Sequence, residues 1–359
     1  MMFVVKGRNQ VRNVVLSAGV LAALACGGGG GGGGFGGQSY SVQTLFQSSD
    51  FISQIRFAPD GRLFFTELAT GRIRIFENGT LLAQEFATVP IATAGEQGLL
   101  GLTFDPDFAN NGFVYVFHTT TGPLRQRIVR FTDVNNIGTN PTVIVDNLPA
   151  GTNHCAGRIG FGMDGKLYAT VGDVGDPANS QNDNTPAGKL LRYNSDGTIP
   201  LDNPIVGNPM YAKGLRNSFG LTFHPTSGTP YASENGPTCD DELNRFVIGG
   251  NYGWRPGIPC GDNDPNFIQA IRTFNPVIAP TGIAFYTGSD IPEFTGDLFM
   301  GSFNDGALRR FRIDDTTGNV LQEERIVTGR SGGVIDVTTG TNGRLYFSDG
   351  TGVYSVMKD

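Results

Sequence analysis

The sequence has no apolar run long enough to cross a bilayer. The apolar stretch near its start, Val14 to Ala25, spans only 12 positions, whereas a membrane-spanning helix needs about 20. Three basic residues precede this stretch, and it ends in an Ala-x-Ala site at residues 23–25, which is typical of a cleaved export signal. We therefore expect residues 1–25 to be a signal peptide and the mature protein to reach the periplasm or the cell surface.

Basic residues are also scarce. The 359 residues include 26 Lys and Arg against 33 Asp and Glu, a net charge of −7. Loss of the signal peptide removes three basic residues and no acidic residue, which leaves 23 against 33 and a net charge of −10. Nucleic acids and anionic membrane surfaces attract basic proteins. The composition therefore argues against both as partners, and it is compatible with a small neutral substrate.

Only four residues are cysteines. Cys26 directly follows the cleavage site and is a candidate for lipid attachment to a membrane, although Ala23 stands where a lipobox prefers leucine. Plain secretion is the alternative. The eight glycines at 27–34 cannot pack into a core, so we expect residues 26–38 to be a flexible tether.

The other three cysteines leave two pairings open. Cys239 and Cys260 could form a disulfide in an oxidising compartment, which would leave Cys155 as a small buried residue. Connectivity cannot be read from the sequence, so the pairing Cys155–Cys239 stays possible.

Long helical patterns are absent as well, and a short turn recurs in their place. Six times, a turn glycine is followed three residues later by Phe or Tyr; these aromatic residues are Phe64, Tyr115, Tyr168, Tyr231, Phe299 and Tyr346. Glycine accepts the positive φ of a tight turn between strands, and a period of about 50 residues is typical of propeller blades. We therefore predict an all-β fold, a six-bladed β-propeller over residues 39–359. A β-sandwich with coincidental turns is the alternative.

The longest intervals between these turns, 165–228 and 228–296, hold the least regular sequence. Loops at the mouth of a propeller channel usually carry the chemistry. Within the second interval, ENGPTCDDELNRFVIGGNYGW (residues 234–254) places four acids beside a Gly-Pro pair. This stretch is either a set of oxygen ligands for a hard cation or a polar surface loop. We expect Asp240 and Asp241 to be solvated acids rather than ligands.

Several long segments resemble one known family. They are GEQGLLGLTFDPDFANNGFVYVFHT from residue 95, HCAGRIGFGMDGKLYATVGD from 154, AGKLLRYNSDGTIPLDNP from 187, GLRNSFGLTFHP from 214 and SENGPTCDDELNRFVIGGNYGW from 233. Together they resemble the glucose/sorbosone dehydrogenase family of soluble sugar dehydrogenases, over roughly residues 40–357. The resemblance implies a six-bladed propeller with pyrroloquinoline quinone (PQQ) and calcium at the channel mouth. It also implies an aldose sugar as substrate and an external electron acceptor.

The resemblance assigns roles to individual residues. His154 matches the general base, a task that suits imidazole because its pKa lies near working pH. Arg216 and Asn217 match the residues that contact the quinone, and Arg216 would stabilise the charge that forms on reduction. Glu96 matches a polar position that lines the pocket.

The same resemblance implies two calcium sites. Gly236 and Pro237 match positions whose carbonyl oxygens hold the active-site ion, which acts as a Lewis acid. Glu242 and Tyr252 match positions of a second, structural ion. The Gly-Pro pair and the acids beside it would then both serve cation binding.

The chain departs from the family pattern where the cofactor's carboxylates are held. Asn304 occupies the place of a lysine, the run 333–336 replaces an Arg-x-Arg-Asp run, and Phe219 replaces a glutamine. Buried carboxylates need paired cations, and the candidates to replace the missing ones are Arg309, Arg310 and Arg330. Two further functions therefore remain open: a non-catalytic propeller that binds a ligand or partner, and a calcium-dependent hydrolase of the lactonase type.

Overall fold

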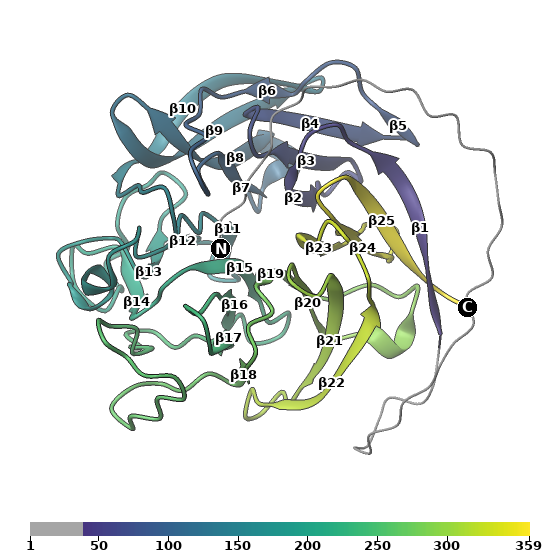
Figure 1. Cartoon of the computed structure of the whole chain (residues 1–359). Coiled ribbons are helices and arrows are strands. Elements are labelled where there is room, and N and C mark those ends of the chain that lie inside the picture. Colours follow the sequence, from purple (N-terminus) through teal and green to yellow (C-terminus); the bar gives the residue numbers. More distant parts are fainter. Residues whose placement is uncertain (1–38) are drawn as a thin grey trace, which may run out of the picture.

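The computed structural model describes residues 39–359, so the expected signal peptide, glycine tether and lipidated Cys26 lie outside the described residues. The described chain forms six antiparallel sheets around a central axis (Figure 1). The six-bladed propeller expected from the recurring turns is confirmed. Helical structure in this part of the chain comprises α1 (Phe108–Asn111) and two short 3-10 segments, η1 (Pro177–Gln181) and η2 (Pro292–Phe294). None of these is long and apolar enough to span a membrane.

Each blade is a meander that runs from the central axis outward. Blade 1 contains β2 (Ile52–Phe57), β3 (Leu63–Glu67), β4 (Arg72–Glu77), β5 (Thr80–Leu81) and β6 (Ala87–Thr88), and blade 2 contains β7 (Leu99–Phe104), β8 (Phe113–Thr121), β9 (Leu124–Val134) and β10 (Ile137–Leu148). Blade 3 contains β11 (Ile159–Phe161), β12 (Leu167–Val171), β13 (Lys189–Tyr193) and β14 (Met210–Lys213), and blade 4 contains β15 (Ser218–Phe223), β16 (Pro230–Glu234), β17 (Asp241–Arg245) and β18 (Arg272–Phe274). Blade 5 contains β19 (Pro280–Phe285), β20 (Leu298–Ser302), β21 (Ala307–Ile313) and β22 (Val320–Val327), and blade 6 contains β23 (Asp336–Thr339), β24 (Leu345–Ser348), β25 (Gly352–Lys358) and β1 (Tyr40–Gln47).

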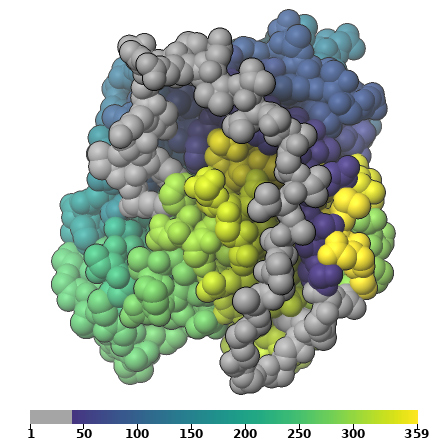
Figure 2. Space-filling model, turned by 45° about the vertical axis from the view of Figure 1, so that its right-hand side comes forward, coloured from purple at the N-terminus to yellow at the C-terminus, as the bar shows by residue number. Residues whose placement is uncertain are grey.

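The first strand of the chain completes the last blade. β1 pairs antiparallel with β25, with Tyr40 opposite Lys358 and Gln47 opposite Gly352. In Figure 2 the purple residues of β1 lie against the yellow residues at the end of the chain. The first and last strands of the propeller are therefore paired in one sheet, and the ring of blades cannot open without breaking this strand pair.

Each of the six predicted turns joins the first and second strands of one blade. The six turn glycines have φ between 64° and 95°, a conformation that glycine adopts without steric cost. In five blades the aromatic residue after the turn packs on the aromatic residue that ends the first strand of the next blade. Ring centroids are 4.9–5.2 Å apart in these pairs, which are Phe64–Phe104, Tyr115–Phe161, Tyr168–Phe223, Tyr231–Phe285 and Tyr346–Phe57.

The fifth blade is the exception to this pairing. Phe299 would meet the end of β23, where Thr339 takes the place of an aromatic residue. Phe299 packs instead on Phe294 and Tyr286 of its own blade. The recurring turn in the sequence is therefore the mark of a recurring contact between neighbouring blades.

The innermost strand of each blade leaves one edge toward the central axis. Backbone groups on such an edge need partners when they are buried, and side chains of neighbouring blades supply them here. The hydroxyl of Ser53 donates to the carbonyl of Leu99 at 2.6 Å. The guanidinium of Arg158 is fully buried and donates to three carbonyls at once, those of Ser53, Leu100 and Phe219, at 2.7–2.8 Å. Arg158 thus joins blades 1, 2 and 4 across the axis.

Candidate active site

The predicted site residues gather at one end of the propeller. Because successive strands of a blade are antiparallel, loops that enter the first strands and loops that join second to third strands share one end, and the glycine turns lie at the other. Glu96, His154 and Arg216 lie in loops that enter blades 2, 3 and 4, and Gly236 and Pro237 lie in the loop between β16 and β17. The fold therefore brings together residues that are 140 positions apart in the sequence, from Glu96 to Gly236.

His154 is held in place by a buried carboxylate. Its backbone has a φ of 55°, and its Nδ1 lies 2.5 Å from Oδ1 of Asp173. The side chain of Asp173 is fully buried, and it also accepts hydrogen bonds from the indole of Trp254 and the backbone N–H of Gly175, both at 2.8 Å. A carboxylate at Nδ1 fixes the proton on that nitrogen and leaves Nε2 as the proton acceptor. The geometry thus suits His154 as a general base.

Sequence analysis gave no role to Asp173 or Trp254. Asp173 ends the segment that begins at His154, so its position within a family-like block was the available signal. Trp254 is the single tryptophan of the chain; it reaches Asp173 through its indole N–H, and its ring lies 5.5 Å from the guanidinium of Arg216. Trp254 therefore connects the histidine to the arginine.

Glu96 and Asn217 support the loop that carries the histidine. Both side chains are buried, and the amide of Asn217 donates to Oε2 of Glu96 at 3.1 Å. The side chain of Asn217 accepts a hydrogen bond from the backbone N–H of Ala156 at 3.0 Å, and that of Glu96 accepts one from the N–H of Cys155 at 3.2 Å. The backbone N–H of Asn217 donates in turn to Oε1 of Glu234. These contacts fix the main chain next to His154; direct contact of Glu96 and Asn217 with a cofactor stays a prediction.

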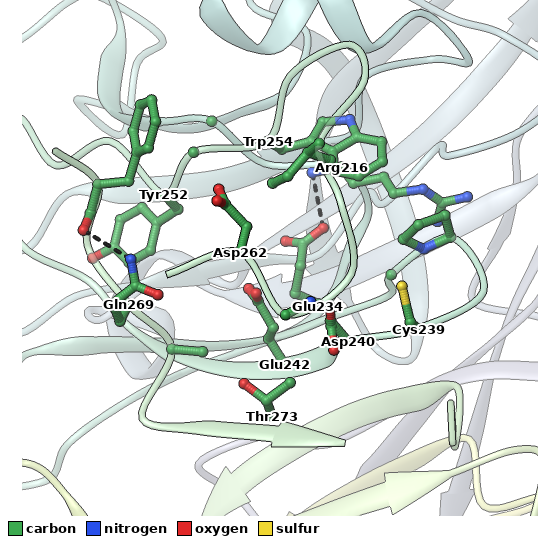
Figure 3. Close-up of a pocket in the computed structure, with 18 of the residues that line it drawn as sticks. Arg216, Glu234, Cys239, Asp240, Glu242, Tyr252, Trp254, Asp262, Gln269 and Thr273 are labelled. Atoms are coloured by element: carbon green, nitrogen blue, oxygen red, sulfur yellow. Dashed lines mark hydrogen bonds between the residues drawn. The ribbon is translucent and has the colours of Figure 1, made fainter. Parts of the chain in front are cut away.

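Arg216 is anchored at its backbone by a second buried carboxyl, that of Glu234. Glu234 accepts from the N–H groups of Arg216 and Asn217 and from the hydroxyl of Ser218. Burial raises the pKa of Glu234 to about 8, although these hydrogen bonds oppose the shift. The guanidinium of Arg216 donates to the carbonyl of Asn235 at 2.8 Å, which leaves its other N–H groups at the edge of the cavity shown in Figure 3.

The four predicted calcium ligands line one cavity of about 300 Å³ together with Arg216. Figure 3 shows the carboxyl groups of Glu234, Glu242 and Asp262 directed into this space. The hydroxyl of Tyr252 donates to the carbonyl of Arg245 at 2.7 Å, so its own main-chain carbonyl is the group that could hold an ion.

The donor set of this cavity fits calcium. In the described part of the chain, no hydrogen bond reaches the carbonyl oxygens of Gly236, Pro237 or Tyr252, and calcium prefers carbonyl and carboxylate oxygens. Burial of its carboxyl raises the pKa of Glu242 to about 7. A cation beside that carboxyl would offset the cost of burying its charge.

The expectation for Asp241 was wrong. Its side chain is buried, and it accepts from the backbone N–H groups of Gly236, Ile278 and Ala279 at 2.7–2.8 Å. Asp241 begins β17, whereas Asp240 remains in the turn with a φ of 58°. Asp241 therefore ties the Gly-Pro turn to the segment that precedes β19.

The disulfide forms between Cys239 and Cys260, and Cys155 is free and buried, so one of the two open pairings is confirmed. The bond ties the Gly-Pro turn to the loop after Trp254. Asp240 lies beside it, but sulfurs that are bonded to each other are not metal ligands. Burial and then the charge of Glu96 raise the pKa of the Cys155 thiol, which makes this cysteine unreactive although it neighbours the histidine.

The three candidate replacements for the missing cations already have acidic partners. Arg309 pairs with Asp305 and Glu323, and Arg310 pairs with Asp297 and Glu324. Both arginines lie on β21, the third strand of its blade.

Arg330 lies in the loop that enters blade 6, at the same end of the propeller as the candidate site. It pairs with Asp349 at 2.5 Å, and its guanidinium lies 4.0 Å from the ring centre of Tyr354. Asn304 is exposed and donates to a main-chain carbonyl, and Ile335 is fully buried. A quinone beside His154 would therefore meet the charge of Arg216, whereas the three candidate replacements are paired with acids.

Comparison with known proteins identifies the family of the chain. The sequence profile of the glucose/sorbosone dehydrogenase family matches residues 51–353. The chain is 34% identical over 287 residues to quinoprotein glucose dehydrogenase B of Acinetobacter calcoaceticus, which covers 68% of this chain and 60% of that protein. It is 28% identical over 337 residues to aldose sugar dehydrogenase YliI of Escherichia coli, which covers 85% of this chain and 89% of that protein. The PQQ-bound form of aldose sugar dehydrogenase from Streptomyces coelicolor has a TM-score of 0.81 and 26% identity, and the match covers 90% of this chain and 99% of that chain. The chain belongs to the glucose/sorbosone dehydrogenase family.

Proposed function

We propose that this protein is an exported quinoprotein aldose dehydrogenase that uses PQQ and calcium and passes electrons to an external acceptor. The observation that carries the proposal is the connected set His154–Asp173–Trp254–Arg216, in which a buried carboxylate holds the imidazole and an indole links it to a cation. The names of the similar proteins, which include a quinoprotein glucose dehydrogenase and a PQQ-bound aldose sugar dehydrogenase, support the same reading.

Each of these residues would have one role in the oxidation of the sugar. When bound, PQQ would supply the two-electron acceptor for the hydride that leaves C1 of the sugar. Nε2 of His154 would take the proton of the C1 hydroxyl, so that C1 becomes the carbonyl carbon of a lactone. The carboxylate of Asp173 would stabilise the imidazolium that results, and the guanidinium of Arg216 would stabilise the negative charge that forms at the electron acceptor.

The direct test is dye reduction by the purified protein. We expect reduction of an artificial dye with aldoses to require both PQQ and calcium. The incomplete set of cations predicts weaker PQQ binding than a complete pocket would give, and Asn304→Lys should tighten it. If a folded, calcium-loaded sample binds no PQQ at high micromolar concentration, the proposal is wrong.

Calcium should raise the melting temperature, and more so at pH 8 than at pH 6. An ion that binds only the folded state stabilises it by about 2.7 kcal/mol at 100 times its Kd. In the calcium-free protein the pKa of Glu242 is raised to about 7, above its unfolded value. The neutral carboxyl therefore contributes stability at low pH that is lost as the pH rises through 7, while calcium needs the carboxylate.

Differential scanning fluorimetry with calcium or a chelator at both pH values measures this effect. Glu242→Gln should remove most of the calcium response. Asp315→Asn, at a side chain that is 85% exposed, is the matched control and should keep it. An unchanged melting curve on chelation would show that this cavity holds no ion.

A second candidate function is a non-catalytic propeller that binds a ligand or partner. The observation that favours it is the replacement of the family cations by Asn304, Gly333 and Ile335. The two functions differ in the PQQ titration: calcium-dependent stabilisation without PQQ binding would favour the binding protein.

A further inference from the structure

A second cavity, of about 380 Å³, lies between blades 1 and 2 at the same end of the propeller as the candidate active site. One wall is the segment 88–90, which begins with the last residue of β6, and the other is formed by the hairpin of β8 and β9 with part of β10. The volume falls in the range of pockets for small molecules.

The face of blade 2 that lines this cavity changes from apolar to polar along its strands. Farther from the mouth the face is apolar and packs on blade 1 through Val114, Val116, Val129 and Phe131. The next residues on the same face are His118 and Thr120 of β8, and directly opposite them on β9 are Arg127 and Arg125. Because side chains alternate along a strand, all four share the face that looks toward blade 1. An interface that served only packing would continue the apolar pattern.

His118 is buried in this wall beside the carbonyl of Pro90. Its side chain is 2% exposed, and neither ring nitrogen makes a hydrogen bond within residues 39–359. Burial, and then the charge of Arg127, lowers the pKa of His118 to about 4; the nearby carbonyl of Pro90 opposes this shift without a hydrogen bond of normal geometry. The neutral ring has one N–H donor and one acceptor nitrogen, and buried groups of this kind normally have a partner.

The two arginines share one carboxylate. Arg127 binds both oxygens of Asp146 at 3.0 Å, and Nε of Arg125 lies 3.3 Å from the same group. A second acid, Glu85, accepts from the hydroxyl of Thr88 at the rim, and its charge is balanced by Arg72 of blade 1 at 3.4 Å. Two guanidinium groups with one directly bound carboxylate give this wall an excess of positive charge, in a protein whose net charge is −7.

We propose that this cavity binds a small oxyanion, a carboxylate or phosphate group on a molecule no larger than a monosaccharide. The guanidinium N–H groups of Arg125 and Arg127 would bind its oxygens, as arginines do in carboxylate and phosphate sites. The N–H of His118 would donate to the same anion, and a hydroxyl on the ligand would donate to the other ring nitrogen. The site is separate from His154 and does not depend on the proposed function.

Isothermal titration of the full chain tests the proposal, with sodium gluconate, inorganic phosphate and neutral glucose as the three probes. We expect saturable binding of at least one anion below about 10 mM. Binding of gluconate alone identifies a hydroxylated carboxylate, binding of phosphate alone identifies a phosphate site, and binding of both identifies a general oxyanion site. Absence of binding by both anions, or equal binding of glucose at this cavity, overturns the proposal.

Three variants assign the binding to this cavity. Arg125→Gln should raise the Kd about tenfold or more, because a charge-assisted hydrogen bond is lost. Arg325→Gln, at a side chain that is 54% exposed in blade 5, makes the same change in net charge and should leave the Kd unchanged. His154→Ala should also leave it unchanged, which separates this cavity from the channel mouth.

A fourth variant guards against misfolding of the first. His118→Phe replaces the unpartnered nitrogens by carbon, so it should weaken anion binding and leave the melting temperature unchanged or higher. If both Arg125→Gln and His118→Phe bind the anions as the unaltered protein does, the cavity is not the site.

Discussion

Replacement of His154 by alanine should remove most of the dye-linked aldose oxidation without unfolding the protein. A positioned base contributes roughly 10²–10⁴-fold to a proton transfer, so we expect kcat to fall by about that factor. The side chain of His154 is 14% exposed, and its loss should change the melting temperature little. The measurement is steady-state dye reduction with PQQ and calcium at saturation.

Asp173→Asn tests how the base is positioned. An amide at this place can donate to Nδ1 and so favours the wrong tautomer. We expect kcat to fall while KM changes little, because the imidazolium formed in the reaction loses its carboxylate partner.

His224→Ala is the matched control for the base. His224 lies at the opposite end of the propeller, where it packs on Phe285 at 4.9 Å between ring centroids. This variant should lose stability and keep its turnover. If His154→Ala retains more than about a tenth of kcat, the base is another group and the proposed roles must be reassigned.

The fold was predictable because each blade carries the same short sequence pattern. A turn glycine with positive φ and an aromatic residue three positions later are visible without any contact map. The sequence also shows the aromatic residues before the turns, such as Phe104 and Phe161. It does not show that each one meets the turn aromatic of the preceding blade, because that contact joins residues on different sheets.

The site was predictable where it coincides with long family-like blocks, and not where the fold alone decides. His154, Arg216 and the Gly-Pro pair were named from such blocks. Asp240 and Asp241 look alike in sequence, yet Asp241 is buried because β17 begins there and its side chain faces three backbone N–H groups. Which of two adjacent acids turns inward depends on the start of the strand, which single-sequence patterns do not define closely.

The sequence also did not show which arginines could replace the missing family cations. Arg309, Arg310 and Arg330 were candidates because they lie close in sequence to the lost positions. In the fold each has an acidic partner, and two of them lie on the third strand of a blade. Proximity in sequence to the lost positions did not show that these arginines are already paired, because acids such as Asp297 and Asp349 lie outside the stretch that carries the lost positions or reach them only in the fold.

Arg158→Met should be the most destabilising single substitution among the channel residues. The guanidinium satisfies three buried carbonyls on the inner edges of blades 1, 2 and 4, and methionine fills similar space without any donor. Each buried acceptor left without a partner costs about 1–3 kcal/mol, while removal of a buried charge recovers part of that loss. Burial lowers the pKa of Arg158 only to about 10, so the side chain is cationic at neutral pH.

We expect a net loss of about 3–5 kcal/mol in the free energy of unfolding, which is the cost of three carbonyls without a partner less the gain from removing the buried charge. Urea denaturation followed by tryptophan fluorescence measures it, because Trp254 lies in the neighbouring blade 4. The free energy of unfolding of Arg158→Lys should lie between those of the unaltered protein and Arg158→Met. One ammonium keeps the charge but cannot reach three carbonyls as the fork of a guanidinium does. Arg325→Met, at an exposed arginine, should change stability by less than about 0.5 kcal/mol. Equal urea midpoints for Arg158→Met and Arg325→Met would mean that the blades hold together without this residue, and that strand pairing and the interblade aromatic contacts alone close the ring.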